Sequence, residues 1–316
     1  MKIALVGPGI MPIPPPGWGA VEILIWDYYK ELTAQGHEVV IINTKQMLEI
    51  ISIVNAGKFD FVHLHYDVFF HILDKLECPN IAITSHYPYI DQPDKYMNDG
   101  YNNIFQFLIK PSRYYNFVLA DKDYATFLKY GANPTKLRKI KNGINSSAFV
   151  FREKPLYNKC IYLGKVTSRK NQRKYQYLPN IDFVGNVDDP NFNTRTPNYL
   201  GEWTRDKIYK ELTNYSNLLL ISEGEADPLV VKEALIAGLG VVINNSSSEN
   251  LDTSHDFITV LDDTKLNDLQ YVYEKIQENM AICTAKRQSI RKYGEETFDI
   301  KVEVGKYLEL VKELNR

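Results

Sequence analysis

Several features of common protein classes are missing from this chain of 316 residues. It has three cysteines, Cys78, Cys160 and Cys283, and no CxxC pair, so neither a disulfide framework nor a structural zinc site is indicated. No apolar stretch approaches the roughly 20 residues of a membrane-spanning helix. The sequence has no internal repeat and no low-complexity tract, and its first residues lead directly into a short apolar run. We therefore expect a protein of a reducing compartment, located in the cytoplasm.

An excess of either charge is also missing. The 37 basic and 39 acidic residues give a formal net charge of -2 and a pI of about 6.3. A nucleic-acid-binding domain is usually strongly basic, so we do not expect nucleic acid as a partner. The 44% hydrophobic and 24% charged residues are typical of a soluble globular protein. The length favours two domains of ordinary size.

Short apolar runs alternate with amphipathic stretches in the first half of the chain. Strands separated by helices predict a parallel α/β sheet, which binds ligands at the carboxyl ends of its strands. His63, His65 and His86 fall at such ends, and we expect His86 to be the functional one. The expected strands cover residues 3–6, 39–42, 61–65 and 81–84, and the expected helices about 21–34, 46–55 and 69–76.

The segment from Gly7 to Gly19 lies between the first strand and the first helix. Its many prolines exclude the tight turn of a dinucleotide-binding fingerprint. Gly17 and Gly19 precede the helix, where the absence of a side chain lets backbone amides approach a diphosphate. Further along, the aromatic-rich stretch 101–115 is expected to pack in the core, with contact to a membrane surface as the alternative.

A polar segment at residues 151–158 marks the expected domain boundary, and a second alternating series follows it. Lys165 and Lys170 come soon after the first strand of this series, where two ammonium groups can neutralise a phosphate. The alternative is a solvated basic loop. Strands are expected at residues 160–163, 181–184, 198–200 and 218–221, and a helix at 205–214.

Residues 222–244 predict a loop, a helix and a strand around which the rest of the chain is organised. Asp227 suits an N-cap, Pro228 the first helical turn, and Gly238 the end of the helix. Glu225 and Glu233 can then face one ligand, because open amides at the helix start suit phosphate and carboxylates suit sugar hydroxyls. The alternative is a capped surface helix with two solvated glutamates.

The chain resembles family 4 glycosyltransferases of the GT-B type over nearly its whole length. The strongest carrier of the resemblance is the spacing of Glu225 and Glu233, which is similar to the family's Glu-x7-Glu motif. The supporting motifs occur in the family's order, at residues 17–22, 36–39, 84–86, 142–145, 164–170 and 296–298.

The resemblance implies two Rossmann-like domains, residues 1–152 on the acceptor side and 153–298 for the nucleotide-sugar, which face a donor-binding cleft. A final helix, about 299–316, would pack back onto the first domain. It also implies a retaining transferase that uses a UDP- or GDP-sugar and a glycan, lipid or small-molecule acceptor. No metal and no cofactor are expected, and peripheral membrane contact is compatible with such an enzyme.

The same resemblance assigns roles to individual residues. Lys165 and Lys170 would hold the donor diphosphate, and Glu233 would bind the ribose. Glu225 and His86 would contact the transferred sugar. The expected catalytic residues are thus Glu225, His86 and Lys170, and the expected donor-binding residues are Gly19, Lys165, Lys170, Asp227, Pro228, Leu229 and Glu233.

Four features depart from the family pattern. Lys165 replaces the more usual Arg, Asn171 replaces a Gly, Trp18 separates two glycines, and the segment between Lys170 and Ile181 is short. Two other interpretations stay open. The apolar strand ending in Asp121 and Asp123 is similar to the metal-binding Asp-x-Asp of another glycosyltransferase class, although these aspartates also suit the first turn of a helix. The chain could also be an inactive GT-B subunit that binds a glycan or a partner enzyme.

Overall fold

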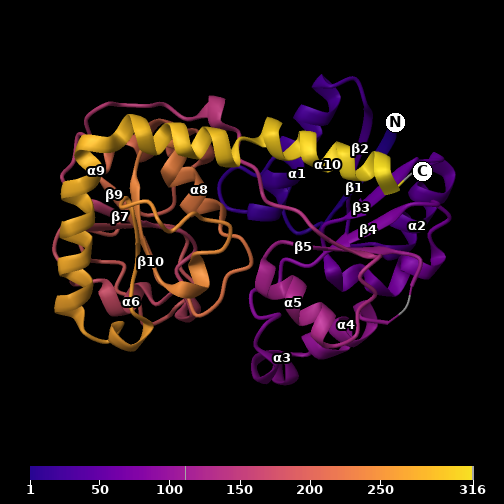
Figure 1. Cartoon of the computed structure of the whole chain (residues 1–316), viewed down its shortest axis with the longest axis horizontal. Helices are drawn as coiled ribbons and strands as arrows, with labels where there is room; N and C mark the ends of the chain where they lie inside the picture. The colour runs from indigo at the N-terminus through magenta and orange to yellow at the C-terminus, as the bar shows by residue number, and fades with distance from the viewer. Residues whose placement is uncertain (111, 315–316) are drawn as a thin grey trace. The chain divides into compact units, whose positions relative to one another are not determined.

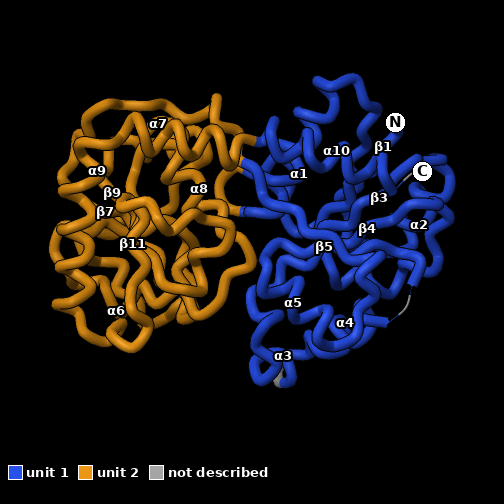
Figure 2. The backbone as a smooth tube through the Cα atoms, in the orientation of Figure 1, with its two compact units in different colours: residues 1–15, 19–143, 300–316 blue, residues 16–18, 144–299 orange. Residues whose placement is uncertain are grey.

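The computed structural model describes residues 1–110 and 112–314, except for the side chain of residue 98. Residue 111 of the aromatic stretch and the last two residues of the expected final helix therefore lie outside the described part. The chain divides into two compact units (Figure 2). Unit 1 comprises residues 1–15, 19–143 and 300–316, and unit 2 comprises residues 16–18 and 144–299.

Unit 1 is built on a parallel sheet of six strands in the order β2-β1-β3-β4-β5-β6. The central strands are mostly apolar and, apart from Lys2 at the start of β1, fully buried, because helices lie on the sheet. The strands are β1 (Lys2–Gly7), β2 (Glu38–Asn43), β3 (Phe61–Leu64), β4 (Ile81–Thr84), β5 (Tyr115–Val118) and β6 (Leu137–Lys139).

The last helix of the chain, α10 (Ile300–Leu314), belongs to unit 1 and packs against α1 (Ala20–Ala34) (Figure 1). It buries Val304, Tyr307 and Val311 in the core. The other helices of unit 1 are α2 (Met47–Gly57), the 3-10 helix η1 (Asp67–Lys75), α3 (Pro93–Asp99), α4 (Tyr101–Leu108) and α5 (Asp121–Lys129).

Unit 2 is a second parallel sheet, with five strands in the order β11-β10-β9-β7-β8. Its strands are β7 (Cys160–Leu163), β8 (Ile181–Val184), β9 (Asn217–Leu220), β10 (Gly240–Ile243) and β11 (Ile258–Val260). Its helices include α6 (Gln172–Tyr175), α7 (Arg205–Glu211), α8 (Leu229–Ile236) and the 30-residue α9 (Leu269–Phe298), and its 3-10 helices are η2 (Ser146–Ala148), η3 (Ser168–Lys170), η4 (Leu212–Asn214), η5 (Asn245–Ser247) and η6 (Asp263–Lys265).

Helix α9 packs tightly on the sheet of unit 2 because Gly240 of β10 faces the helix. A Cβ atom on Gly240 would lie 1.9 Å from the sulfur of Cys283, so only glycine allows this approach. Arg287 of α9 is buried and donates hydrogen bonds to the carbonyl oxygens of Arg152 (2.8 Å), Tyr215 (2.8 Å) and Thr213 (2.6 Å). Burial lowers the pKa of the Arg287 guanidinium to about 10, so it stays charged at neutral pH.

The structure confirms the α/β class and most expected elements, with three differences. Residues 198–200 form no strand, and only Tyr199 makes an isolated bridge to Phe183. The expected helix at 69–76 is a 3-10 helix. The units divide at residue 143 rather than 152, because Ile144 bridges to Asp299 within unit 2. Tyr101, Phe105 and Leu108 of α4 are buried, as the core interpretation of the aromatic stretch predicted.

Candidate functional site

The sheet of unit 2 has a topological switch point between β7 and β9. From β7 the chain continues to β8 on one side and later returns to β9 on the other. In sheets of this kind ligands bind at the carboxyl ends of the strands that flank the switch. The loop after β7 carries Lys165 and Lys170, and the loop after β9 carries Glu225. The topology therefore brings three of the predicted site residues to one edge of the sheet.

Lys170 and Glu225 meet at this edge. The Lys170 ammonium lies 3.3 Å from Glu225 Oε1. Arg169, the neighbour of Lys170 in the 3-10 turn η3, places its guanidinium 2.8 Å from the same oxygen. Arg169 also donates to Ser222 Oγ at 3.1 Å and to the carbonyl of Gly224. One carboxylate thus links the β7 loop to the β9 loop through two cations.

The charge balance of this cluster favours an ionised Glu225. Its side chain is 11% exposed, and burial on its own would raise its pKa. Lys170 and Arg169 outweigh this effect, so the pKa of Glu225 lies below its ordinary value. Two cations face one carboxylate, and the cluster carries one positive charge available to an anionic ligand.

Tyr162 of β7 connects the loop after β7 with the loop after β9 through hydrogen bonds. Its hydroxyl accepts a hydrogen bond from the Ile221 amide at 2.8 Å and donates one to the carbonyl of Lys170. The residue is buried, and burial raises the pKa of its phenol. The backbone of Lys170 is therefore held at a defined height above the sheet.

Helix α8 begins one residue later than the sequence predicted. Pro228 is the N-cap, with φ -69° and ψ 114°, and Leu229 is the first helical residue. Asp227 is not the cap, because its carboxylate pairs with Lys232 at 2.6 Å. Gly238 ends the helix as predicted, in a left-handed conformation with φ +83°. The predicted role of this segment in phosphate binding thus rests on the backbone N–H groups of Asp227 and Leu229, because Pro228 has none.

Glu233 lies in the second turn of α8 and has a separate partner. Its Oε1 accepts a hydrogen bond from Arg205 of α7 at 2.7 Å, and both side chains are largely buried. Burial alone would lower the pKa of Arg205, but Glu233 outweighs it and raises that pKa above its ordinary value. Glu225 and Glu233 therefore differ in environment, and neither is a solvated surface carboxylate.

Lys165 points to yet another group. Its ammonium lies 3.1 Å from Asp188 Oδ2, and this pair is substantially exposed. Exposed ion pairs contribute little to stability, so Lys165 can exchange Asp188 for a stronger anion at low cost.

In unit 1 the predicted residue Gly19 is the N-cap of α1 and has φ +122°. An L side chain rarely adopts this conformation, and a Cβ atom here would lie 3.1 Å from Glu22 Oε2 and 3.3 Å from Pro15. Glycine is therefore required at the start of α1.

Three histidines of unit 1, His63, His65 and His86, lie together at the ends of β3 and β4. The rings of His63 and His65 are 3.8 Å apart between centroids, and those of His65 and His86 are 6.1 Å apart. His63 is hydrogen-bonded to Thr84 Oγ1 at 2.7 Å and to the hydroxyl of Tyr307 at 3.2 Å. Burial lowers the pKa of His63 to about 3 and that of His86 to about 4, so both rings are neutral at neutral pH.

This cluster predicts acid sensitivity. In the unfolded chain a histidine binds a proton near pH 6.5, whereas His63 in the folded protein does so only near pH 3. The contribution of the neutral His63 ring to the free energy of unfolding is thus complete above about pH 6.5. It is lost as the pH falls toward the pKa of His63 in the folded protein. We expect the urea midpoint of unfolding to fall between about pH 6.5 and 4.5, less steeply in His63→Gln. His71→Gln, at an exposed ring, is the control, and equal slopes in wild type and His63→Gln would contradict the assignment.

Asp121 and Asp123 lie in the first turn of α5, as the helical interpretation predicted. Asp121 pairs with Lys139 at 2.6 Å, and its carboxylate is 81% exposed. Asp123 is buried. The two carboxylates therefore occupy different environments.

Three contributors to the site of unit 2 were missed at the sequence level. Arg169 is adjacent to Lys170 and pairs with the buried Glu225. The only sequence signal for its role is that two basic residues stand side by side at positions 169 and 170. Arg205 and Tyr162 reach their partners through tertiary contacts that no local pattern encodes.

Solved structures of glycosyltransferases resemble the whole chain. AviGT4, a glycosyltransferase involved in avilamycin A biosynthesis, matches with a TM-score of 0.74 at 14% identity, covering 99% of this chain and 98% of AviGT4. Sucrose-phosphate synthase from Thermosynechococcus elongatus matches at 0.76 and 14%, covering 99% and 98%. HepE of Anabaena in complex with UDP-glucose matches at 0.73 and 13%, covering 98% and 100%.

The sequence itself matches no family model and no curated protein. The structural similarity nevertheless extends over both units and over nearly the full length of each of these three enzymes. Two parallel sheets of six and five strands with their helices, together with this similarity, show that the protein has the GT-B fold of glycosyltransferases.

Proposed function

We propose that this protein is a retaining glycosyltransferase that moves a sugar from a UDP- or GDP-sugar to a glycan, lipid or small-molecule acceptor. The observation that carries the proposal is the 3.3 Å contact of Lys170 with Glu225 at the switch point of unit 2. Two solved neighbours support the nucleotide-sugar: one HepE structure holds UDP-glucose and another holds UDP and glucose.

In the proposed mechanism the charge of the leaving diphosphate is stabilised by the protein. Lys170 and Lys165 supply ammonium groups, and the amides at the start of α8 supply aligned dipoles. Because these groups are already in place in the folded protein, we propose that the reaction needs no metal ion. We assign no enzymic nucleophile.

In this proposal the carboxylates of Glu233 and Glu225 bind different parts of the donor. Glu233 accepts hydrogen bonds from the ribose hydroxyls, and Glu225 contacts the transferred sugar.

The division of roles gives a calorimetric prediction. Glu233→Gln weakens charge-assisted hydrogen bonds to ribose, so we expect UDP to bind about ten to a hundred times more weakly. Glu225→Gln should leave the affinity for UDP nearly unchanged and lower turnover instead, because the sugar is absent from UDP. Titration of each variant with UDP, and with GDP if UDP fails to bind, measures the difference.

Glu274→Gln on the exposed face of α9 is the matched control and should change neither quantity. Circular dichroism checks that Glu233→Gln keeps its fold after losing the carboxylate charge that pairs with Arg205. A larger loss of UDP affinity in Glu225→Gln than in Glu233→Gln would mean that the two roles are assigned the wrong way round. Equal losses in the two variants would reject the site.

The metal-independent mechanism predicts that EDTA does not abolish transfer. Asp121→Asn should also cost little, because Asp121 is exposed and pairs only with Lys139 among the contacts resolved for it. The assay follows release of nucleoside diphosphate with EDTA, and with manganese added back. Loss of activity in EDTA that manganese restores would support the Asp-x-Asp interpretation instead.

An inactive GT-B subunit is the second candidate, and the short α6 favours it, because this helix has only four residues. A thermal-shift screen against UDP-, GDP- and ADP-sugars, followed by a donor hydrolysis assay, separates the two. A donor at 100 times its dissociation constant stabilises the protein by about 2.7 kcal/mol. Slow hydrolysis of the stabilising donor counts against the inactive subunit.

A further inference from the structure

Glu233 and Arg205 form an ion pair between two helices of unit 2. Glu233 lies in the second turn of α8, and Arg205 is the first residue of α7. The Nη2 atom of Arg205 lies 2.7 Å from Glu233 Oε1, and the side chains of Arg205 and Glu233 are 13% and 5% exposed. Because both charges are largely removed from water, each depends on the other for compensation, and the pair fixes the position of the carboxylate.

The contact occupies only one of the two carboxylate oxygens of Glu233. Arginine often binds a carboxylate through two parallel N–H groups, which engage both oxygens. Here the Nε atom of Arg205 is buried and has no hydrogen-bond partner in the described part of the chain. Glu233 Oε2 has no partner among the described residues either, yet it is not one of the polar atoms closed to solvent. One oxygen of Glu233 is therefore held by the protein, and the other is open to a ligand.

Arg205 is itself held by its own helix. Its Cζ atom lies 4.7 Å from the centre of the ring of Tyr209, which follows four residues later on α7. The Thr204 side chain caps the start of α7 by accepting a hydrogen bond from the Lys207 amide. A guanidinium that stacks on an aromatic ring at a capped helix start has little freedom. The carboxylate that it binds therefore keeps one orientation.

We infer that Arg205 is a positioning residue that makes Glu233 selective for a ribose hydroxyl. Because Glu233 binds the ribose in the proposed function, this role of Arg205 rests on that function. A mobile glutamate loses rotamer freedom when it accepts a hydrogen bond from a ligand. Arg205 removes that freedom in advance, so Oε2 binds the hydroxyl strongly and stays unpaired when the hydroxyl is missing. The ligand class is therefore a ribonucleoside diphosphate, and analogues without that hydroxyl are rejected.

Titration calorimetry with UDP, 2′-deoxy-UDP and 3′-deoxy-UDP tests this role, with the guanosine series if GDP binds instead. In the wild type we expect at least one deoxy analogue to bind about tenfold or more weakly than UDP, as the loss of one charge-assisted hydrogen bond does. In Arg205→Met this ratio should fall below about threefold, because Glu233 is no longer held in place. A purely structural arginine would instead weaken all three ligands equally and leave the ratio unchanged.

Two further variants separate position from charge. Arg205→Lys keeps the charge and one donor for Glu233 Oε1, so the ratio should stay within about threefold of the wild-type value. Tyr209→Leu frees the Arg205 guanidinium without removing its charge and should lower the ratio. Tyr209→Leu also serves as the test if Arg205→Met does not fold.

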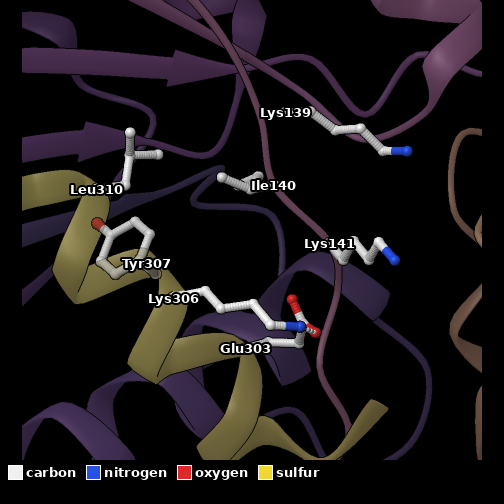
Figure 3. Close-up of a pocket in the computed structure, with 7 residues that line it drawn as sticks. All are labelled: Lys139, Ile140, Lys141, Glu303, Lys306, Tyr307 and Leu310. Atoms are coloured by element: carbon white, nitrogen blue, oxygen red, sulfur yellow. Dashed lines mark hydrogen bonds and ion pairs between the residues drawn. The ribbon is translucent and has the colours of Figure 1, made fainter. Parts of the chain in front are cut away.

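Lys306→Met in unit 1 is the matched control. Figure 3 shows Lys306 beside Glu303 on α10, among the residues that line a cavity. The Lys306 ammonium lies 2.8 Å from Glu303 Oε1, and Glu303 is 4% exposed, as is Glu233. Lys306→Met thus removes the cation beside an equally buried glutamate that the proposed donor site does not use. It should leave the ratio unchanged.

A wild-type ratio that is retained in Arg205→Met would overturn the inference. If Glu233→Gln then abolishes the ratio, the proposed function stands without Arg205. If Glu233→Gln also retains it, the ribose role of Glu233 is wrong as well. Equal affinity of the wild type for UDP and both deoxy analogues, or no binding of either nucleotide series, would reject the inference and that ribose role together. A ratio lowered as much in Lys306→Met as in Arg205→Met would also overturn the inference, because position would then not matter.

Discussion

Lys170→Ala is expected to lower turnover about 10²- to 10³-fold while the protein stays folded, the usual cost of removing one preorganised charge-stabilising group. Lys170 is held by two independent contacts, one at its ammonium and one at its backbone. Glu225 Oε1 lies 3.3 Å from the ammonium, and Tyr162 anchors the backbone of the same residue. A group fixed in this way needs no reorganisation when charge develops on the leaving diphosphate. Glu225→Ala is expected to cost a similar factor.

The measurement is the rate of nucleoside diphosphate release from the donor that the thermal-shift screen identifies. Lys275→Ala is the control, since Lys275 lies on the exposed face of α9 and pairs with Glu278 three residues later. Near-normal turnover of Lys170→Ala and Glu225→Ala would remove both from the site. A loss in Lys275→Ala of the same size would show that general charge, rather than position, matters.

Asp227→Asn is expected to destabilise the protein by about 3 to 5 kcal/mol, because it removes the charge of the carboxylate that pairs with the buried Lys232 ammonium. The two side chains are 0% and 1% exposed and lie 2.6 Å apart. Lys232 also lies 5.1 Å from the centre of the Phe298 ring, near the end of α9. The pair thus connects the start of α8 with the last turn of α9.

Urea denaturation measures this change in the free energy of unfolding. Asp227→Asn combined with Lys232→Met removes both charges and should recover most of the lost stability, because replacing a whole buried pair is often neutral. Lys275→Ala, at a surface pair, should cost no more than about 1 kcal/mol. A cost of that small size for Asp227→Asn would mean that water reaches the Lys232 ammonium.

The sheets of both units could be predicted from the sequence. Fully buried parallel strands such as β7 and β8 are short apolar runs, and the expected ranges coincide with the observed ones. The observed α10, Ile300–Leu314, lies within the expected range of about 299–316, and its apolar residues recur with helical spacing. Residues 198–200 do not form a strand because their backbone pairs with β8 only around Phe183, in one isolated bridge, and Tyr199 donates to the carbonyl of Thr196 instead.

The site was predictable only in part. The spacing of Glu225 and Glu233 and the two lysines after β7 could be recognised as a pattern, but their partners could not. Asp227 looked like a helix cap because aspartate before proline often is one, whereas a lysine five residues later offers it a stronger electrostatic partner. Arg169 and Arg205 depend on which loops the sheet order brings together, and this order is a property of the tertiary fold.

The return of α10 to unit 1 constrains how the protein can be made. Unit 1 is left at residue 143, and residues 300–316 complete it. Until α10 leaves the ribosome, its partners in the core, including Tyr28 and His63 beside Tyr307, lack their cover. Residues 144–299 of unit 2 are synthesised in this interval, so unit 2 can fold first although most of it comes second in the chain. During translation unit 1 therefore remains an incomplete intermediate until α10 is available. A chaperone that binds exposed apolar surface would bind unit 1 at this stage.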